Sequence, residues 1–124
     1  MKPVFVDTSA FIAIGNSRDA FHAQAVKTVA ALKQSQQILV TTDAVLLEFD
    51  NAFSPVHLRH VAVSMIEAVR ASEKWQCIPA DAALVERGFQ KFKQMQDKDW
   101  GFVDCLSIVA ANDLGINEVF GGWA

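Results

Sequence analysis

The sequence has few cysteines and no long hydrophobic run, which excludes several classes of protein. It contains only two cysteines, Cys77 and Cys105, and their spacing is not that of a metal site, so we expect reduced thiols rather than a disulfide scaffold. It also has no long hydrophobic run, and Asp7 interrupts the first apolar stretch, which argues against a signal peptide or a membrane span. We therefore expect a soluble, cytoplasmic protein without membrane association.

An excess of positive charge is missing as well. The 124 residues carry a net charge of -3, which excludes the broad basic surface that holds nucleic acid through its phosphates alone. Any nucleic-acid contact must then be local or mediated by a metal ion. No repeat, linker or low-complexity segment divides the chain, and 52% of its residues are hydrophobic. We expect one domain over residues 1–124, with some apolar surface left for a partner.

Short apolar runs alternate along the chain with longer helical patterns. We expect strands at 4–6, 38–40, 75–78 and 118–120, and helices at 43–53, 55–71, 81–93 and 102–114. A further helix, capped by Asp19, would use Phe21, Ala25, Val29 and Leu32 as its buried face. This alternation predicts an α/β fold, in which a parallel sheet lies between layers of helices. Such strands are buried on both faces, so polar chemistry is expected where they end.

Acidic residues occupy such positions. Asp7 follows the first strand, Asp104 lies in the first turn of the last helix, and Asp99 comes just before that helix. Glu48 shares a helical face with Val45, Phe49 and Ala52, so we expect it to point inward. Carboxylates brought together in this way would suit a shared Mg²⁺ or Mn²⁺ ion, which prefers oxygen ligands and removes their mutual repulsion.

Each acid also has a structural interpretation. Asp7 could cap a helix beginning near Thr8, and Asp104 could favour the positive end of its helix, a stabilisation of ~0.3–1 kcal/mol. Asp99 could be a loop residue, and a modest rotation would let Glu48 reach solvent or an arginine. Two other groups are open to a functional and a structural interpretation. Lys91, Lys93 and Lys98 could form the edge of an RNA groove or a solvated helix end. His57 and His60 could be ligands or part of an exposed helical face.

The segments that carry these acids resemble one known family. VFVDTSAFIAI, TTDAVLLEFDNAF, SPVHLRH and DKDWGFVDCLSIVAANDLGI are similar, in this order, to PIN domains and in particular to VapC-type toxins of bacterial type II toxin–antitoxin pairs. The resemblance implies a PIN-like α/β/α fold and a Mg²⁺- or Mn²⁺-dependent endoribonuclease that cleaves tRNA or rRNA. It assigns catalysis and metal binding to Asp7, Glu48 and Asp104, adds Asp99 to the metal ligands, and places Thr8 or Ser9 beside the metal. It also implies an antitoxin partner and a homodimer.

The C-terminus departs from the family pattern. Where relatives carry a Thr-x-Asp-like element and a fifth strand, this chain reads EVFGGWA, with Gly121 and Gly122 in the threonine region and Trp123 where the acid would stand. We therefore expect four strands, a fifth that is missing or truncated, and an unprotected sheet edge at 118–120. The departure leaves an alternative open, a catalytically degraded PIN-like module that binds a partner protein or RNA. A phosphate-accepting receiver-like domain fits less well, because the second strand leads to Thr41 rather than to an acid.

Overall fold

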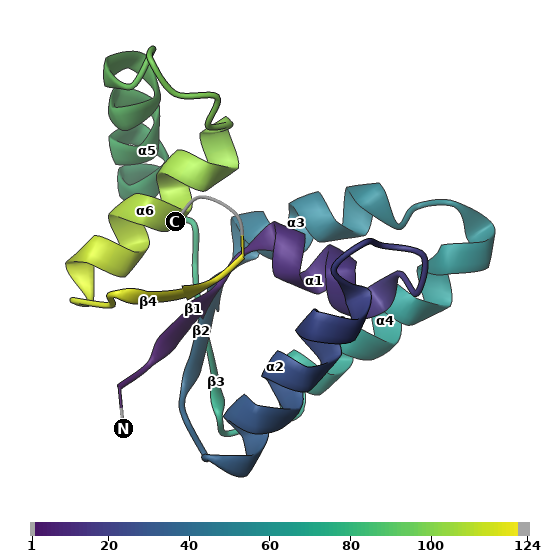
Figure 1. The fold of residues 1–124 in the computed structure, drawn as a ribbon. Coiled ribbons are helices and arrows are strands. Elements are labelled where there is room, and N and C mark those ends of the chain that lie inside the picture. Colours follow the sequence, from purple (N-terminus) through teal and green to yellow (C-terminus); the bar gives the residue numbers. More distant parts are fainter. Residues whose placement is uncertain (1, 122–124) are drawn as a thin grey trace.

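Four parallel strands form the central sheet of the computed structural model, which describes residues 2–121 (Figure 1). They are β1 (Val4–Val6), β2 (Leu39–Thr42), β3 (Trp75–Ile78) and β4 (Glu118–Phe120), in the order β3-β2-β1-β4. All four strands were predicted. The second strand begins at Leu39 rather than at residue 38 and runs on to Thr42, because Thr41 and Thr42 pair with β3. Their hydroxyls are also satisfied: Thr41 Oγ1 donates to the Val6 carbonyl, and Thr42 Oγ1 accepts from the Val45 N–H.

Six helices accompany the sheet within the described residues. They are α1 (Thr8–Gly15), α2 (His22–Gln34), α3 (Asp43–Ala52), α4 (Val56–Ala71), α5 (Ala82–Gln94) and α6 (Phe102–Asp113). Figure 1 shows α1, α2 and α4 on one side of the sheet and the hairpin of α5 and α6 on the other. The predicted three-layer α/β/α arrangement is therefore confirmed. None of the helices within residues 2–121 combines the length and the apolar character that crossing a bilayer requires.

The expected start of α2 was wrong. Asp19 does not cap this helix; its Oδ1 accepts a hydrogen bond from the Phe21 N–H at 2.8 Å, in a turn that precedes the first helical residue, His22. An Asx turn of this kind satisfies the backbone locally and delays the helix. As a result Phe21 lies outside the buried face and is 68% exposed, whereas Ala25 is buried.

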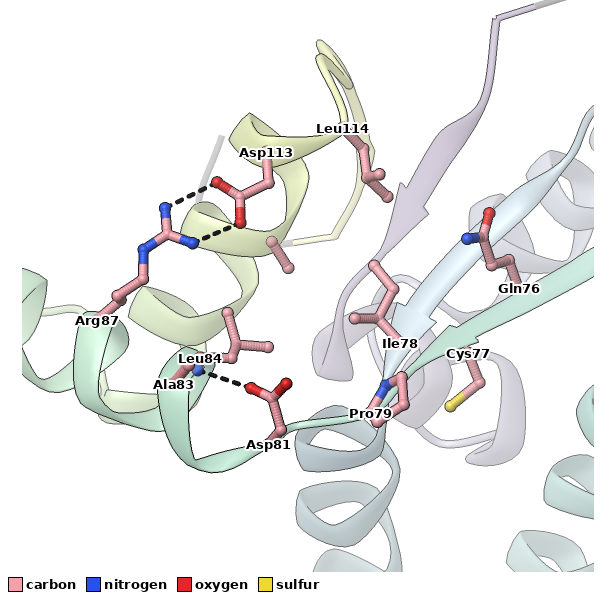
Figure 2. Close-up of a pocket in the computed structure, with 11 residues that line it drawn as sticks. Gln76, Cys77, Ile78, Pro79, Asp81, Ala83, Leu84, Arg87, Asp113 and Leu114 are labelled. Atoms are coloured by element: carbon pink, nitrogen blue, oxygen red, sulfur yellow. Dashed lines mark hydrogen bonds and ion pairs between the residues drawn. The ribbon is translucent and has the colours of Figure 1, made fainter.

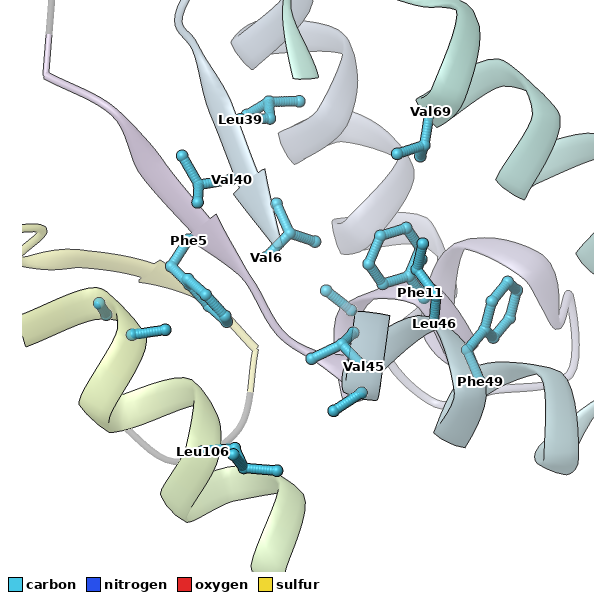
Figure 3. Packing of buried hydrophobic residues seen from close by; sticks show 14 of the residues in the cluster. Phe5, Val6, Phe11, Leu39, Val40, Val45, Leu46, Phe49, Val69 and Leu106 are labelled. Atoms are coloured by element: carbon cyan, nitrogen blue, oxygen red, sulfur yellow. The ribbon is translucent and has the colours of Figure 1, made fainter. Parts of the chain in front are cut away.

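Aromatic and aliphatic side chains fill both sides of the sheet (Figure 3). Phe5 lies between β1 and α6, while Phe11 and Phe49 are stacked with ring centroids 5.4 Å apart. Phe49 also meets Phe53 at 4.7 Å, so one buried ring joins α1 to α3. Because β1 is flanked by strands and covered on both faces, its three residues are all buried.

The α5–α6 hairpin is held together by close backbone approach and by charge. A Cβ atom at Gly88 would lie 2.8 Å from Leu106 Cγ, so only glycine lets the two helices pack this closely. Near the other end of α6, Arg87 donates two hydrogen bonds to Asp113, which raises the pKa of Arg87 and lowers that of Asp113. The hairpin therefore presents α6 to the sheet as a fixed unit.

The strand order locates the expected ligand crevice. The chain passes from β1 to β2 and β3 in one direction and then returns to place β4 on the other side of β1. Ligands of open α/β sheets bind where the strand order reverses, outside the carboxyl ends of the strands. In this chain that position lies at the ends of β1 and β4, where Asp7 and Gly121 are found.

Candidate metal and nuclease site

Asp7 is the most deeply buried acid of the predicted set. It follows β1 directly and is only 3% exposed, and its backbone N–H donates to the Phe120 carbonyl at 2.9 Å, which ties the ends of β1 and β4 together. Asp7 occupies the N-cap position of α1, yet its side chain makes no capping hydrogen bond. Capping of α1 by this carboxylate, the structural interpretation of Asp7, is therefore not what the geometry shows.

Gly121 lies against Asp7 at the switch point. It has a φ of +129°, and a Cβ atom there would lie 2.7 Å from Asp7 Cβ and 2.9 Å from Ser9 Oγ. The residue that departs from the family pattern is thus the one that lets the end of β4 approach the acid. Gly122 and Trp123, on which the missing acid and strand depend, lie outside the described residues.

Replacement of Gly121 by alanine is expected to destabilise the fold and to displace Asp7. The added methyl group meets Asp7 in a backbone conformation that L-residues avoid, so the free energy of unfolding should fall by about 2–4 kcal/mol. Denaturant titration measures this change. The matched control is Gly115→Ala, which also has a positive φ, +66°, but open space around its Cβ position; it should cost only about 1 kcal/mol. Equal losses for the two variants would contradict close packing of Gly121 on Asp7.

Asp104 has a defined structural task. It lies at the third position of α6, and its Oδ2 accepts a hydrogen bond from the Gly101 N–H at 2.9 Å. This bond satisfies a backbone donor at the helix start, as the structural interpretation of Asp104 predicted. It also fixes the orientation of the half-buried carboxylate.

The expected inward orientation of Glu48 was wrong. Val45 and Phe49 are buried, but Glu48 is exposed, as is Ala52, which shares its side of α3. Successive helical residues are rotated by about 100°, so a helix that directs Val45 and Phe49 into the core turns Glu48 to its flank. Because Glu48 is exposed, its carboxylate avoids the desolvation cost that burial would have imposed.

The remaining predicted residues lie at different depths. Asp99 is exposed in the loop before α6, and Ser9 is exposed on the first turn of α1. The Thr8 hydroxyl, by contrast, is buried and finds no hydrogen-bond partner within residues 2–121. Ser107, which the sequence analysis did not single out, shares both properties and lies one turn after Asp104. Buried hydroxyls are normally hydrogen-bonded, so a water or ligand beside these two would complete them.

The three main acids come from elements that touch one another, since α3 contacts both α1 and α6. Their side chains are not gathered, however. Across residues 2–121, no three His, Cys, Asp or Glu side chains lie close enough together to hold a metal ion. The donor set itself, carboxylates with neighbouring hydroxyls, is the kind that Mg²⁺ and Mn²⁺ prefer. The donor types therefore suit a divalent cation, but within residues 2–121 they are not positioned to bind one together.

Two hollows accompany this region. A pocket of about 880 Å³ lies between β4, α1 and α2, and Ser9 and Gly121 place one end of it beside Asp7. Another, of about 370 Å³, lies between the end of β3 and the α5–α6 hairpin (Figure 2). Its charged groups are already engaged, because Asp81 caps α5 and Arg87 pairs with Asp113. This smaller pocket is better explained by the packing of the hairpin than by catalysis.

Cys77, at the rim of the smaller pocket, is poorly suited to act as a nucleophile. Burial and the hydrogen bond from its Sγ to Asp43 Oδ1 raise the pKa of its thiol to about 12, so the reactive thiolate is scarce at neutral pH. Cys105 is buried, and both thiols are free, as predicted.

Comparison with known proteins shows what the chain resembles. No protein-family model matches the chain. The 23S rRNA-specific endonuclease VapC20 of Mycobacterium tuberculosis is 27% identical over 119 residues, which cover 94% of this chain and 86% of that protein. The crystal structure of VapC20, described as a sarcin–ricin loop cleaving toxin, superposes with a TM-score of 0.83 at 26% identity, covering 97% of this chain and 89% of that chain.

More distant structures share the fold alone. VapBC2 of Rickettsia felis, bound to a promoter DNA fragment, gives a TM-score of 0.68 at 12% identity over 97% of this chain and 88% of that chain. FitAcB of Neisseria gonorrhoeae gives a TM-score of 0.59 at 12% identity, over 91% of this chain and 83% of that chain. The chain therefore has a PIN-like α/β/α fold with this sheet order. It is similar to VapC20 in sequence and in structure over nearly its whole length.

Proposed function

We propose that this chain is an endoribonuclease toxin of the VapC type, which hydrolyses a phosphodiester bond of RNA in the cytoplasm. The observation that carries the proposal is the placement of Asp7. This acid is buried at the switch point of the sheet, in a chain that aligns over 94% of its length with a named rRNA endonuclease. A carboxylate kept there contributes little to helix capping and is well placed to serve a ligand.

We further propose Mg²⁺ or Mn²⁺ as the cofactor, held by Asp7, Glu48 and Asp104, with Asp99 as an additional ligand. All four supply the hard oxygen donors that these ions select. Glu48 is exposed, so it can change rotamer at little cost to meet the two less exposed acids. When bound, the cation would supply charge stabilisation for the phosphate and a lowered pKa for water.

The residues of the chain itself would contribute position and proton handling. The strand-end hydrogen bond to Phe120 fixes the backbone of Asp7, and the Gly101 N–H fixes one oxygen of Asp104. Thr8 and Ser107 offer buried hydroxyls that can orient water or an acid, while Ser9 lies at the open side. Preorganised groups of this kind favour the transition state because they need no reorganisation during the reaction.

The relatives suggest the substrate and the partners. Since VapC20 acts on 23S rRNA at the sarcin–ricin loop, we propose a structured rRNA loop as the substrate here. Lys91, Lys93 and Lys98 would contact its phosphates from the α5–α6 hairpin. Because the chain is similar to the toxin VapC20 over nearly its whole length, we also propose a cognate antitoxin partner and a homodimer.

The proposal is tested by incubating the purified protein with a 23S rRNA sarcin–ricin loop oligonucleotide in Mn²⁺. We expect one or a few defined cuts, no cleavage in excess EDTA, and recovery when Mn²⁺ is restored. A hairpin of equal length with a scrambled loop is the control and should stay intact. Cleavage that continues undiminished in EDTA would contradict the metal-dependent mechanism, and no cleavage of any ribosomal RNA would contradict the nuclease itself.

One observation favours a second candidate, a PIN-like module that binds a partner or RNA without cleaving it. Within residues 2–121 the acids are not gathered around a common point. This candidate predicts RNA or partner binding that neither requires a divalent ion nor changes when Asp7 is replaced.

A further inference from the structure

Buried hydroxyl groups without a hydrogen bond lie beside two of the proposed site acids. Within residues 2–121, the hydroxyls of Thr8 and Ser107 are buried and have no protein partner. Thr8 follows Asp7 directly, and Ser107 comes three residues after Asp104. The buried hydroxyls of β2, by contrast, are both hydrogen-bonded. A buried polar group without a partner is rare in native proteins, so these two mark a place where a further ligand is expected.

Ser107 is the more deeply buried of the two, with 0% of its surface exposed. A serine within a helix can donate to the carbonyl group of the residue four positions earlier, which satisfies its hydroxyl locally. The Ser107 hydroxyl does not bond to Val103 in this way. Leaving a buried hydroxyl unbonded costs stability, so Ser107 is expected to bond to a group from outside the protein chain.

The Ser107 side chain lies on the side of α6 that faces the sheet. Leu106 packs against Gly88 of α5, and the residue that follows it is rotated away from α5 by about 100°. Ala110 and Ala111, one turn after Ser107, belong to the hydrophobic core. Since α6 also contacts β2 and α3, the buried hydroxyl faces these elements.

The direction of α6 brings Ser107 toward the carboxyl ends of the strands. The helix leads into β4 and runs opposite to it (Figure 1). From Ser107 to Asp113 the helix rises by about 9 Å, and the three residues of β4 rise by about 7 Å. Ser107 therefore lies near the level at which β4 ends, where the Phe120 carbonyl accepts from the Asp7 N–H.

Ser107 and Asp104 are neighbours on α6. Residues three positions apart in a helix have Cβ atoms about 5–6 Å apart. Helical side chains lean toward the N-terminus, so that of Ser107 leans over the turn that carries Asp104. The Gly101 N–H engages Oδ2 of Asp104 and leaves Oδ1 available. A separation of this size suits one water molecule that bonds to both side chains.

We infer that Ser107 is a positioning residue of the site, whose hydroxyl holds Asp104 through one bridging water molecule. The inference rests on the proposed nuclease function. The hydroxyl donates to the water, and the water donates to Asp104 Oδ1. With Oδ2 held by Gly101 and Oδ1 by the water, the carboxylate keeps one orientation. Each carboxylate oxygen has two acceptor positions, so Oδ1 can still bind a cation.

Calorimetric titration with Mn²⁺ tests the positioning role. Ser107→Ala removes the hydroxyl and little else, and loss of such an outer-shell partner should weaken Mn²⁺ binding by about 10- to 100-fold. Cys105→Ala is the matched control. It removes one atom of an equally buried side chain on the opposite side of α6, so its affinity should equal that of the parent. Thermal unfolding confirms that both variants are folded. A purely structural role of Ser107 would change the melting temperature but not the affinity.

A crystal structure of the metal-free parent protein tests the bridge itself. The inference predicts a water molecule within hydrogen-bonding distance of both Ser107 Oγ and Asp104 Oδ1. A Ser107 hydroxyl that bonds to the Val103 carbonyl without such a water would overturn the inference, and so would parental Mn²⁺ affinity of Ser107→Ala. A bridging water in a parent protein that binds no Mn²⁺ would instead refute the metal-dependent nuclease, and the bridge would remain as a structural contact only.

Discussion

Asp7→Asn is expected to abolish RNA cleavage while leaving the fold intact. The substitution keeps the size of the side chain and removes its negative charge at the switch point of the sheet. Replacing even outer-shell partners of a metal site lowers activity by about 10- to 100-fold, so loss of a direct ligand should lower the cleavage rate by about 100-fold or more. Single-turnover cleavage of the rRNA loop oligonucleotide measures the rate, and thermal unfolding confirms that the protein is folded.

The matched control is Asp81→Asn. Asp81 is another aspartate at a helix N-cap, where its Oδ1 accepts from the Leu84 N–H at 2.9 Å, and asparagine caps helices equally well. It borders the smaller pocket, away from β4, and should cleave RNA at the parental rate. Parental activity of Asp7→Asn would show that the buried acid is not part of the nuclease site.

Phe49→Ala is expected to cause the largest loss of stability. Phe49 is fully buried and packs on both Phe11 and Phe53, so alanine leaves a cavity among rings that cannot all collapse into it. The free energy of unfolding should fall by about 3–5 kcal/mol, and the melting temperature by roughly 10–20 °C. Denaturant unfolding followed by circular dichroism measures the change.

Phe21→Ala makes the same chemical change at a ring that is 68% exposed. It should alter the free energy of unfolding by no more than about 0.5 kcal/mol. Similar losses in the two variants would contradict the packing of α3 on α1. Because Phe49 directly follows Glu48, the same packing also fixes the helix that carries this acid.

The strands and the layers could be predicted because they follow from patterns within the chain. The runs at 4–6 and 75–78 both form strands with the predicted bounds; the first is buried throughout, whereas the second lies at the sheet edge and is only partly buried. The start of α2 could not be predicted as easily. Aspartate is a favoured N-cap residue, but the Asp19 side chain accepts a hydrogen bond in the turn before the helix instead. Local hydrogen-bond competition of this kind depends on backbone angles that the sequence does not state.

The candidate site divides in the same way. The position of Asp7 at a strand end followed from the sequence. The orientation of Glu48 did not, because successive helical residues are rotated by about 100°, and a rotation of α3 by less than this angle decides whether Glu48 faces the core. The close approach of Gly121 to Asp7 depends on β4 lying beside β1, a long-range pairing. A glycine directly after a strand was the available signal.

The central claim, that the acids share a divalent cation, is tested most directly by calorimetric titration with Mn²⁺. The parent protein, Asp7→Asn and Glu48→Gln should be compared under identical conditions. The account predicts saturable binding by the parent and its loss in both variants. No binding by the folded parent, or equal binding by all three proteins, would contradict a shared metal site and would favour the non-catalytic binding module.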